Sequence, residues 1–413
     1  MKTKLFLIAT ILLLLHSLQI KAQQWEYVNT LQSDGLLKKV CTQGLDTVYI
    51  VGLNGLIAKS TDRALTWSKQ YFPTKVLLNN IIFINHNIGF AVGANGTILR
   101  TIDAGVNWTQ QTSGTTDYLK AIAATGFNNI WAVGISTILR STDGGQTWNK
   151  EKLLSDTIQL NDVDFYSDYG FIVGNYNTIL KTVNKGDTWV LQTGLKSPSP
   201  FAGFQSLCMT DHNVFMINSM DIDTIYKSTD YVHWEKKSPS NVLHDMTDIY
   251  FKNDTIGYIS TYFIYTSGSS QGKTFNYKTI DGGNNWTLTS TLEDGHSNGN
   301  FVFVNDTLGY FISGKKLYRT PYTGKFNLLG GLSERKSTTQ LKFNQTGNNL
   351  IVTSNNELLK AFEILTPAGV IKYYSTVNST VLRIDVSSLP KGIYLLSSTF
   401  NDKSKEIVKW IKQ

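Results

Sequence analysis

The sequence predicts an all-β protein, a seven-bladed β-propeller followed by a small antiparallel β-sandwich. Three observations support this prediction. Tryptophans recur from Trp25 to Trp286 at steps of 42, 41, 40, 41, 45 and 52 residues. Short apolar runs alternate with turn residues inside each step, and a repeat of about 40 residues built from short strands is typical of a propeller blade. After Gly331 the repeat stops and a different strand pattern begins.

The first 22 residues have the features of a secretory signal. Lys2 and Lys4 precede an apolar run from Leu5 to Leu15, and Ala22 offers a small residue for cleavage before Gln23. The run is about 11 residues long, whereas a membrane-spanning helix needs about 20. We therefore expect a cleaved signal peptide over 1–22 and no transmembrane segment in the mature chain.

Charge is unevenly distributed along the 413 residues. The net charge is +7, of which residues 1–22 carry +3 and residues 338–413 carry +4, from nine Lys or Arg and five Asp or Glu. The remaining residues, 23–337, are therefore neutral overall. Because nucleic-acid binding relies on a cationic surface, the sequence predicts no nucleic-acid partner.

The two cysteines lie far apart in the repeat. Cys41 falls in the first repeat and Cys208 in the fifth. A disulfide needs Cα atoms within about 7 Å, which two distant blades of a ring do not provide. We expect two buried, unpaired thiols.

Residues 79–113 show the order of strands expected in one blade. Asn79–Ile84 is an apolar first strand, Ile88–Gly93 a second, Thr97–Thr101 a third, and Trp108–Gln111 the outer strand. Asn95-Gly96 predicts a hairpin turn, because both residues tolerate positive φ. The same order recurs seven times.

Either of two segments can complete the last blade. Trp25 stands 42 residues before Trp67, and Phe326 takes the tryptophan position 40 residues after Trp286. The simplest arrangement adds residues 25–28 as the outer strand, which pairs both ends of the chain and closes the ring. The sequence leaves the choice between the Trp25 and Phe326 segments open.

Six tryptophans of the recurring series end a version of the phrase Ser/Thr-x-Asp-x-Gly-x-Thr/Asn-Trp: Trp67, Trp108, Trp148, Trp189, Trp234 and Trp286. We interpret it as a braced turn: the carboxylate accepts backbone amides, the hydroxyl supports the same turn, Gly adopts positive φ, and the indole packs inward. Ala64 and Asn184 depart from the pattern at the Gly and Asp positions. The predicted structural residues are Ser60, Asp62, Trp67, Thr101, Asp103, Gly105, Trp108, Ser141, Asp143, Gly145, Trp148, Thr182, Gly186, Trp189, Ser228, Asp230, Trp234, Thr279, Asp281, Gly283 and Trp286.

This phrase resembles the Asp box, or BNR repeat. Together with the preceding Val-Gly-x-x-Gly-Thr-Ile-Leu-x-Thr element, it makes residues 24–330 similar to the propellers of photosystem assembly factors and their bacterial relatives. Sialidases also carry Asp boxes, but their chemistry needs clustered arginines. Arg100, Arg140 and Arg319 instead occupy one repeated third-strand position. We therefore predict no catalytic residues and no enzyme, with a glycosidase as the alternative.

No motif for a cofactor or a metal is present in the sequence. Dinucleotide, Walker and nucleophile-elbow patterns are missing, and the histidines after residue 22 lack metal-ligand spacing. We therefore expect no cofactor and no metal.

Candidate ligand contacts gather where loops of the ring would form a funnel. They include an aromatic run within the longest insertion, 261–277, and acids near the starts of first strands. A surface loop without function is the alternative for the insertion. The candidates are Tyr262, Phe263, Tyr265, Asp162, Asp164, Asp245 and Asp248.

Residues 341–413 alternate in short strands with hairpin turns, as in a small β-sandwich, after a polar linker over 333–340. The segments 362–369 and 384–394 and the Lys-rich end resemble the type A C-terminal sorting domain of the Bacteroidetes type IX secretion system. The usual Tyr-Pro-Asn-Pro opening is missing, and an ordinary adhesion module is the alternative. By this resemblance the sorting signal comprises Leu389, Pro390, Gly392, Tyr394, Lys405, Lys409 and Lys412.

An Asp-Thr-aliphatic triplet recurs five times, at 46–48, 156–158, 223–225, 254–256 and 306–308. It resembles the O-glycosylation motif of the same bacteria. Ordinary turn chemistry before a strand explains it equally well, so both interpretations stay open.

These features predict a monomeric binding protein for a protein or glycan ligand, secreted or held at the surface of a Gram-negative, Bacteroidetes-like bacterium after passing through the periplasm. The outer-membrane type IX machinery would be its export partner. A glycoside hydrolase that uses the funnel, or an extracytoplasmic assembly or scaffold factor, are the alternatives.

Overall fold

The computed structural model describes residues 25–320 and 341–412, with gaps within both ranges. The gaps are 74, 152–157, 194, 196–201, 219–223, 240–241, 243, 265–271, 296–298, 306–307, 347–348, 355–358, 366–370, 388, 390–391 and 401–404. The predicted signal peptide over 1–22, Phe326 and the predicted linker over 333–340 lie outside the described residues. The chain divides into two compact units after Tyr322.

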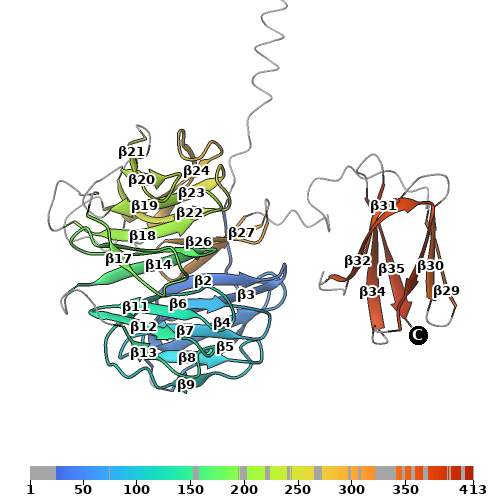
Figure 1. Ribbon diagram of the computed structural model, residues 1–413, viewed down its shortest axis with the longest axis horizontal. Coiled ribbons are helices and arrows are strands. Elements are labelled where there is room, and N and C mark those ends of the chain that lie inside the picture. Colours follow the sequence, from blue (N-terminus) through green and yellow to red (C-terminus); the bar gives the residue numbers. More distant parts are fainter. Residues whose placement is uncertain are drawn as a thin grey trace, which may run out of the picture. The chain divides into compact units, whose positions relative to one another are not determined.

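The first unit consists of seven four-stranded antiparallel sheets, the blades of a propeller (Figure 1). The innermost strands are β2 (Leu37–Gln43), β6 (Leu78–Phe83), β10 (Leu119–Ala124), β14 (Leu160–Tyr166), β18 (Phe204–Met209), β22 (Asp245–Phe251) and β26 (Asn300–Phe303). The second strands are β3 (Thr47–Gly52), β7 (Gly89–Gly93), β11 (Ile130–Gly134), β15 (Tyr169–Gly174), β19 (Val214–Asn218), β23 (Gly257–Ile264) and β27 (Gly309–Ser313).

The third and outer strands complete each sheet. The third strands are β4 (Leu56–Ser60), β8 (Ile98–Thr101), β12 (Thr137–Ser141), β16 (Ile179–Thr182), β20 (Ile225–Ser228), β24 (Gly272–Thr279) and β28 (Lys316–Arg319). The outer strands are β5 (Ser68–Tyr71), β9 (Thr109–Gln111), β13 (Asn149–Lys150), β17 (Val190–Leu191), β21 (Glu235–Lys237), β25 (Thr287–Gly295) and β1 (Glu26–Tyr27). A 3-10 turn, η1 (Leu53–Gly55), connects β3 to β4.

The N-terminal segment closes the ring. β1 pairs with β28, so the last sheet runs β26-β27-β28-β1. The Trp25 ring packs against Phe301, Phe303 and Phe311 at centroid distances of 5.8 to 5.9 Å. The Trp25 segment thus takes the outer position that the repeat register predicts.

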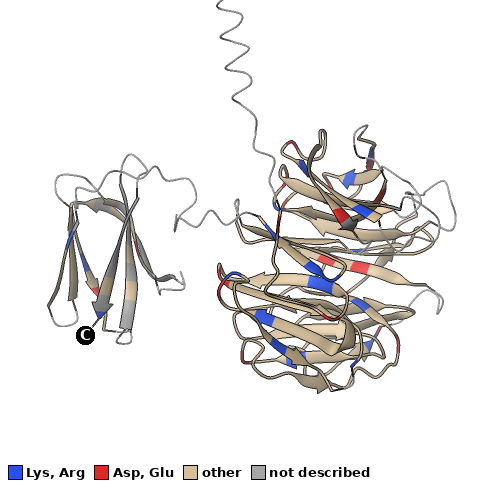
Figure 2. Cartoon of the chain, turned by 180° about the vertical axis from the view of Figure 1, so that it is seen from behind, with Lys and Arg blue, Asp and Glu red and all other residues tan. Residues whose placement is uncertain are grey.

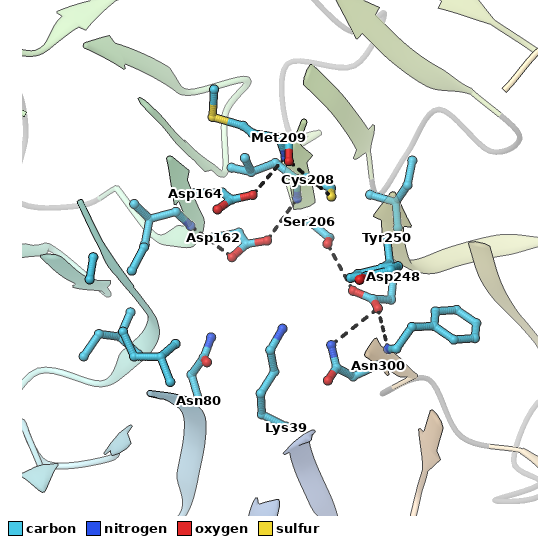
Figure 3. Close-up of a pocket in the computed structure, with 18 of the residues that line it drawn as sticks. Lys39, Asn80, Asp162, Asp164, Ser206, Cys208, Met209, Asp248, Tyr250 and Asn300 are labelled. Atoms are coloured by element: carbon cyan, nitrogen blue, oxygen red, sulfur yellow. Dashed lines mark hydrogen bonds between the residues drawn. The ribbon is translucent and has the colours of Figure 1, made fainter. Parts of the chain in front are cut away.

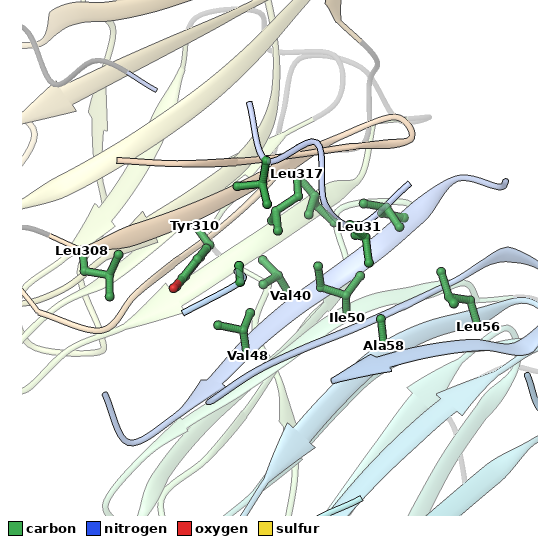
Figure 4. Close-up of a cluster of buried hydrophobic side chains, with 13 residues drawn as sticks. Leu31, Val40, Val48, Ile50, Leu56, Ala58, Leu308, Tyr310 and Leu317 are labelled. Atoms are coloured by element: carbon green, nitrogen blue, oxygen red, sulfur yellow. The ribbon is translucent and has the colours of Figure 1, made fainter. Parts of the chain in front are cut away.

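The apolar core lies between neighbouring sheets. Where the last sheet meets the first, Val40, Ile50 and Ala58 pack against Tyr310 and Leu317 (Figure 4). Second strands are apolar on both faces because each is covered by a neighbouring blade on either side. The β-propeller prediction is confirmed by this architecture.

The second unit contains two antiparallel sheets. One has the order β29-β30-β33 and the other β32-β31-β34-β35. One apolar cluster draws residues from both, including Val352, Ile384, Phe362 and Leu396. The strands are β29 (Leu341–Thr346), β30 (Asn349–Ser354), β31 (Leu359–Leu365), β32 (Ile371–Ser379), β33 (Val381–Asp385), β34 (Gly392–Phe400) and β35 (Lys405–Lys412).

Candidate functional site

A cavity of about 660 Å³ occupies the channel between the innermost strands (Figure 3). In six of these strands the pairing with the second strand shifts near the start, as in a β-bulge. In β2, for example, Lys39 is the first paired residue after the shift. Most of the residues that follow the shift line the cavity, because the bulge turns them toward the axis of the ring. Those that line it, with the corresponding residue of β26, are Lys39, Asn80, Asp162, Ser206, Asp248 and Asn300.

The two acids of β14 bind the next blade. Asp162 accepts the backbone N–H of Leu207 at 3.0 Å, and Asp164 accepts that of Met209 at 2.9 Å. Each also accepts the N–H of its own following residue. The inner edge of β18 is not paired with another strand, so these carboxylates satisfy donors that would otherwise face the channel.

The same arrangement continues through the next two blades. Asp248 accepts the N–H of Phe301 at 3.1 Å and the hydroxyl of Ser206 at 3.2 Å. Asn300 in turn accepts the N–H of Val40 at 3.2 Å, which carries the pattern across the closure of the ring. We call this side of the channel, from β14 to β26, the clamped side.

Burial raises the pKa of these carboxyl groups. Loss of hydration raises the pKa of Asp164 to about 7 and that of Asp248 to about 6, and it also raises the pKa of Asp162. By surface area Asp162 and Asp164 are only half-buried, but the surface they retain faces the enclosed channel, so the loss of hydration dominates. Their backbone hydrogen bonds and the Lys39 ammonium act in the opposite direction.

The other side of the channel presents polar groups without such bonds. Lys39 and Asn80 extend into the cavity opposite the carboxylates (Figure 3). The Asn80 side chain is 8 % exposed, and its Oδ1 has no hydrogen-bond partner. We call Lys39 and Asn80 the open side of the channel.

The Asp-box turns lie away from the channel, on the connections between third and outer strands. In one of them Asp143 accepts the N–H groups of Gln146 and Thr147 at 3.0 and 2.9 Å. The hydroxyl of Ser141 donates to Asp143 and accepts the N–H of Gly145, both at 2.8 Å. The acid thus braces its own turn.

The tryptophans and third-strand cations join neighbouring blades. Trp148 packs edge-on against Phe90, and Trp189 against Trp131, both on the second strand of the preceding blade. Because each cation contacts the turn of the next blade, these cations do not converge on one site. The pairs are Lys59 with Ala104, Arg100 with Gly144, Arg140 with Asp187, Lys181 with Tyr231, Lys227 with Gly282 and Arg319 with Arg63. Figure 2 shows charges of both signs interspersed over the propeller.

The aromatic candidates lie on an extension of the sixth blade. The insertion is described at both ends as paired strand, because β23 and β24 continue to the pair Ile264 and Gly272. Phe263 is 37 % exposed and its ring lies 4.3 Å from that of His244, which also packs against Phe275 at 5.1 Å.

The remaining ligand candidates divide between the extension and the channel. Tyr262 pairs with the exposed Asp245 on this extension, and Tyr265 lies outside the described residues. The structure therefore separates the described candidates: Asp162, Asp164 and Asp248 share the channel, whereas Tyr262, Phe263 and Asp245 do not line it.

In the second unit, three of the predicted sorting residues come together. Lys412 is buried, and its ammonium donates to the carbonyls of Val386 and Leu389. Tyr394 belongs to the apolar core, and Leu389 packs against it. Gly392 begins β34 and Lys405 and Lys409 lie on β35, whereas Pro390 is outside the described residues.

Both cysteines are free, as expected from their spacing, and Cys208 is buried while Cys41 is partly exposed. Across the described residues, no set of three or more His, Cys, Asp or Glu side chains is placed to hold a metal ion. Within the same residues no helix is long and apolar enough to span a membrane.

Sequence reasoning missed four channel residues: Lys39, Asn80, Ser206 and Asn300. Each occupies the same blade position as Asp162, because each pairs with the next-to-last residue of its second strand. Aligning the repeats on this position, and not on the tryptophan alone, would have found them.

Comparison with known proteins agrees with this architecture. The family described as photosynthesis system II assembly factor YCF48 matches residues 57–139 and 102–242. No curated protein matches the chain. The chain is therefore similar to a β-propeller family with BNR-type repeats over somewhat less than half of its length.

Solved structures share the fold at low sequence identity. YCF48 bound to D1 peptide is 18% identical over 72% of this chain and 97% of its own, with a TM-score of 0.56. Virginiamycin B lyase from Staphylococcus aureus is 13% identical over 72% and 99%, with a TM-score of 0.59. PorZ, a surface component of the type-IX secretion system of Porphyromonas gingivalis, is 12% identical over 92% of this chain and 59% of its own, with a TM-score of 0.51.

Proposed function

We propose that this protein is an exported β-propeller that binds a protein or glycan partner without transforming it. The observation that carries the proposal is the extension of the sixth blade, which presents the exposed Phe263 ring packed at a tilt against His244. Exposed aromatic rings supply large contact areas at little entropic cost, and they serve peptides and sugars equally well.

The strand pairing gives this surface a rigid support. β23 and β24 pair continuously from Gly257 with Thr279 to Ile264 with Gly272, and β25 follows β24 on its other edge. Phe263 and Phe275 lie on the same face because they are diagonal neighbours across the pair. A partner would therefore meet a preformed aromatic surface and would not have to order a loop.

The bonding of the channel acids favours binding over hydrolysis. Asp162, Asp164 and Asp248 each accept a backbone N–H of the following blade, which gives them a role in holding the ring together. Three carboxylates do share the cavity, as a glycosidase would require. The binding experiment therefore also measures hydrolysis of glycosides.

The two ends of the chain support export. Residues 1–22 would direct the protein to the periplasm, and residues 341–413 would address it to an outer-membrane translocon that leaves it at the surface or releases it. The buried clasp between Lys412 and the carbonyls of Val386 and Leu389 would fix the turn that this machinery reads. The likeness to PorZ is compatible with such a setting.

Binding is tested on purified residues 23–413 with a glycan array, a peptide array and a panel of fluorogenic glycosides. We expect retention of a glycan or a peptide and no turnover of any glycoside. Phe263→Ala should weaken retention at least tenfold, whereas Tyr71→Ala, which removes an exposed ring from β5, should leave it unchanged. Turnover of a glycoside, or equal effects of the two variants, would contradict the proposal.

Export is tested by removing residues 333–413 from the full-length gene product. The shortened chain should accumulate in the periplasm, and the complete chain should reach the surface or the medium. Surface delivery of the shortened chain would show that the C-terminal unit is not an export address.

A further inference from the structure

The two sides of the channel differ in how their polar groups are used. On the clamped side, acceptors at equivalent positions bind the N–H of the next innermost strand, as Asp162 does with Leu207. Asn80 stands at the same blade position, yet its Oδ1 has no partner. The Nδ2 of Asn80 points into the cavity and has no acceptor among the described residues, so the side chain offers a donor to a group that arrives from outside the chain.

Lys39 has the same character. It is half-buried, extends into the cavity and forms no hydrogen bond or ion pair with the residues that the structure describes. A cation held in a channel at this depth is stabilised by an anionic or acceptor group nearby. The channel thus offers one unpaired cation, Lys39, and one unpaired amide donor, Asn80 Nδ2, opposite three carboxylates.

The carboxylates retain capacity for a ligand. Each oxygen has two lone pairs, and the backbone N–H groups that Asp162 and Asp164 accept use one on each oxygen. A ligand donor can therefore bind these oxygens without displacing the amides of the next blade. Among the described residues that line the cavity, one cation, Lys39, stands against three carboxylates, Asp162, Asp164 and Asp248, so this polar part of the cavity attracts an ammonium group.

The far end of the cavity is apolar. Phe83 and Ile84, at the end of β6, and Phe127, in the turn after β10, line it, and Phe127 is 63 % exposed. The polar residues lie near the starts of the innermost strands. A ligand that enters past Phe127 would place a charged head among the polar groups and an apolar tail against these side chains.

We propose that the channel cavity binds an apolar α-amino acid as a zwitterion. Its ammonium group donates to Asp162 and Asp248, its carboxylate accepts from Lys39 and from Asn80 Nδ2, and its side chain lies toward Phe127. A cavity of about 660 Å³ accommodates a molecule of this size with room for water. The inference goes beyond the proposed function, because it concerns the channel and not the extension of the sixth blade.

The test is calorimetric titration of residues 23–413 with three compounds that differ in charge only at the head. L-Leucine carries both charges, leucinamide lacks the carboxylate, and N-acetyl-L-leucine lacks the ammonium. We expect L-leucine to bind with a Kd below ~1 mM and each analogue at least tenfold more weakly. Equal binding of leucinamide, equal binding of N-acetyl-L-leucine, or no binding of L-leucine would overturn the proposal.

Variants locate the site. Lys39→Met should weaken L-leucine at least tenfold while leaving leucinamide unchanged, and Asp248→Asn should weaken both. Asp245→Asn is the matched control, because Asp245 lies on the same strand but outside the cavity and should change neither. A control that behaves like Asp248→Asn would overturn the placement. A negative titration leaves the array result for the extension unaffected, so the two proposals fail separately.

Discussion

The outer Asp-box turns and the inner channel use the same residue type under opposite conditions. Asp143 and Asp164 each accept two backbone N–H groups. Hydrogen bonds from Thr147 lower the pKa of Asp143, whose turn is open to solvent, to about 2, whereas burial in the channel raises the pKa of Asp164 to about 7. The degree of hydration therefore decides whether the pKa of a hydrogen-bonded acid is lowered or raised. Such an acid can stabilise the fold in one region and destabilise it in another.

The largest expected effect belongs to a glycine of the outer turns. Gly186 has φ +88°, and a Cβ there would lie 2.3 Å from Cζ2 of Trp131 on the preceding blade. Gly186→Ala should destabilise the protein by ~3 kcal/mol, from positive φ and from the clash together. Gly283 has the same φ but its nearest atom is at 3.6 Å, so Gly283→Ala should cost only ~1 kcal/mol. Chemical denaturation measures both, and equal losses would show that the clash contributes nothing.

Removing a turn acid should have a smaller effect. Asp143→Ala leaves the N–H groups of Gln146 and Thr147 to water and should cost ~1–2 kcal/mol at pH 7, limited by the exposure of the turn. Because the folded pKa of Asp143 is lowered, its contribution is complete above about pH 4 and is lost as pH falls toward 2. Denaturation curves at pH 7 and pH 3 should therefore differ more for the wild type than for the variant. A penalty that is the same at both pH values would contradict the assigned pKa.

Neutralising a channel acid should stabilise the protein at high pH, whereas removing a turn acid destabilises it. The folded pKa of Asp164 is raised, so the folded state holds the proton more tightly and this group's contribution to stability declines as pH rises from about 4 to about 7. Asp164→Asn keeps an acceptor for Met209 and removes the charge. We expect equal stability near pH 4 and a gain of ~1–2 kcal/mol at pH 8, with Lys39 opposing and Asp162 reinforcing the shift. Asp143→Asn, which removes a charge from a turn open to solvent, should show no such gain at pH 8.

The same contrast explains what the sequence could predict. The Asp-box turns depend on residues within eight positions, such as Ser141 to Trp148, so a repeated phrase is enough to infer their hydrogen bonds. The channel depends on residues about 40 positions apart, such as Asp162 with Leu207, which only the closed ring brings together. Lys39 and Asn80 carry no local signal, because a lysine or an asparagine near the start of a strand is ordinary. Their role in the channel depends on the residues of the blades that face them.

The smallest expected effect concerns the thiol beside these acids. Cys208 accepts the N–H of Phe251 through its sulfur at 3.2 Å, and burial raises its pKa well above the ordinary value, with Asp164 adding to the rise. The thiol should therefore resist iodoacetamide at pH 8 in the folded protein and react at once after unfolding. Cys208→Ala should cost only ~1 kcal/mol, because it leaves a small cavity and one weak acceptor missing. Mass spectrometry of alkylated Cys208 in the native state gives the decisive readout. Rapid native labelling would mean that the channel is more hydrated than its walls imply, and the raised pKa of Asp164 would then lose its physical basis as well.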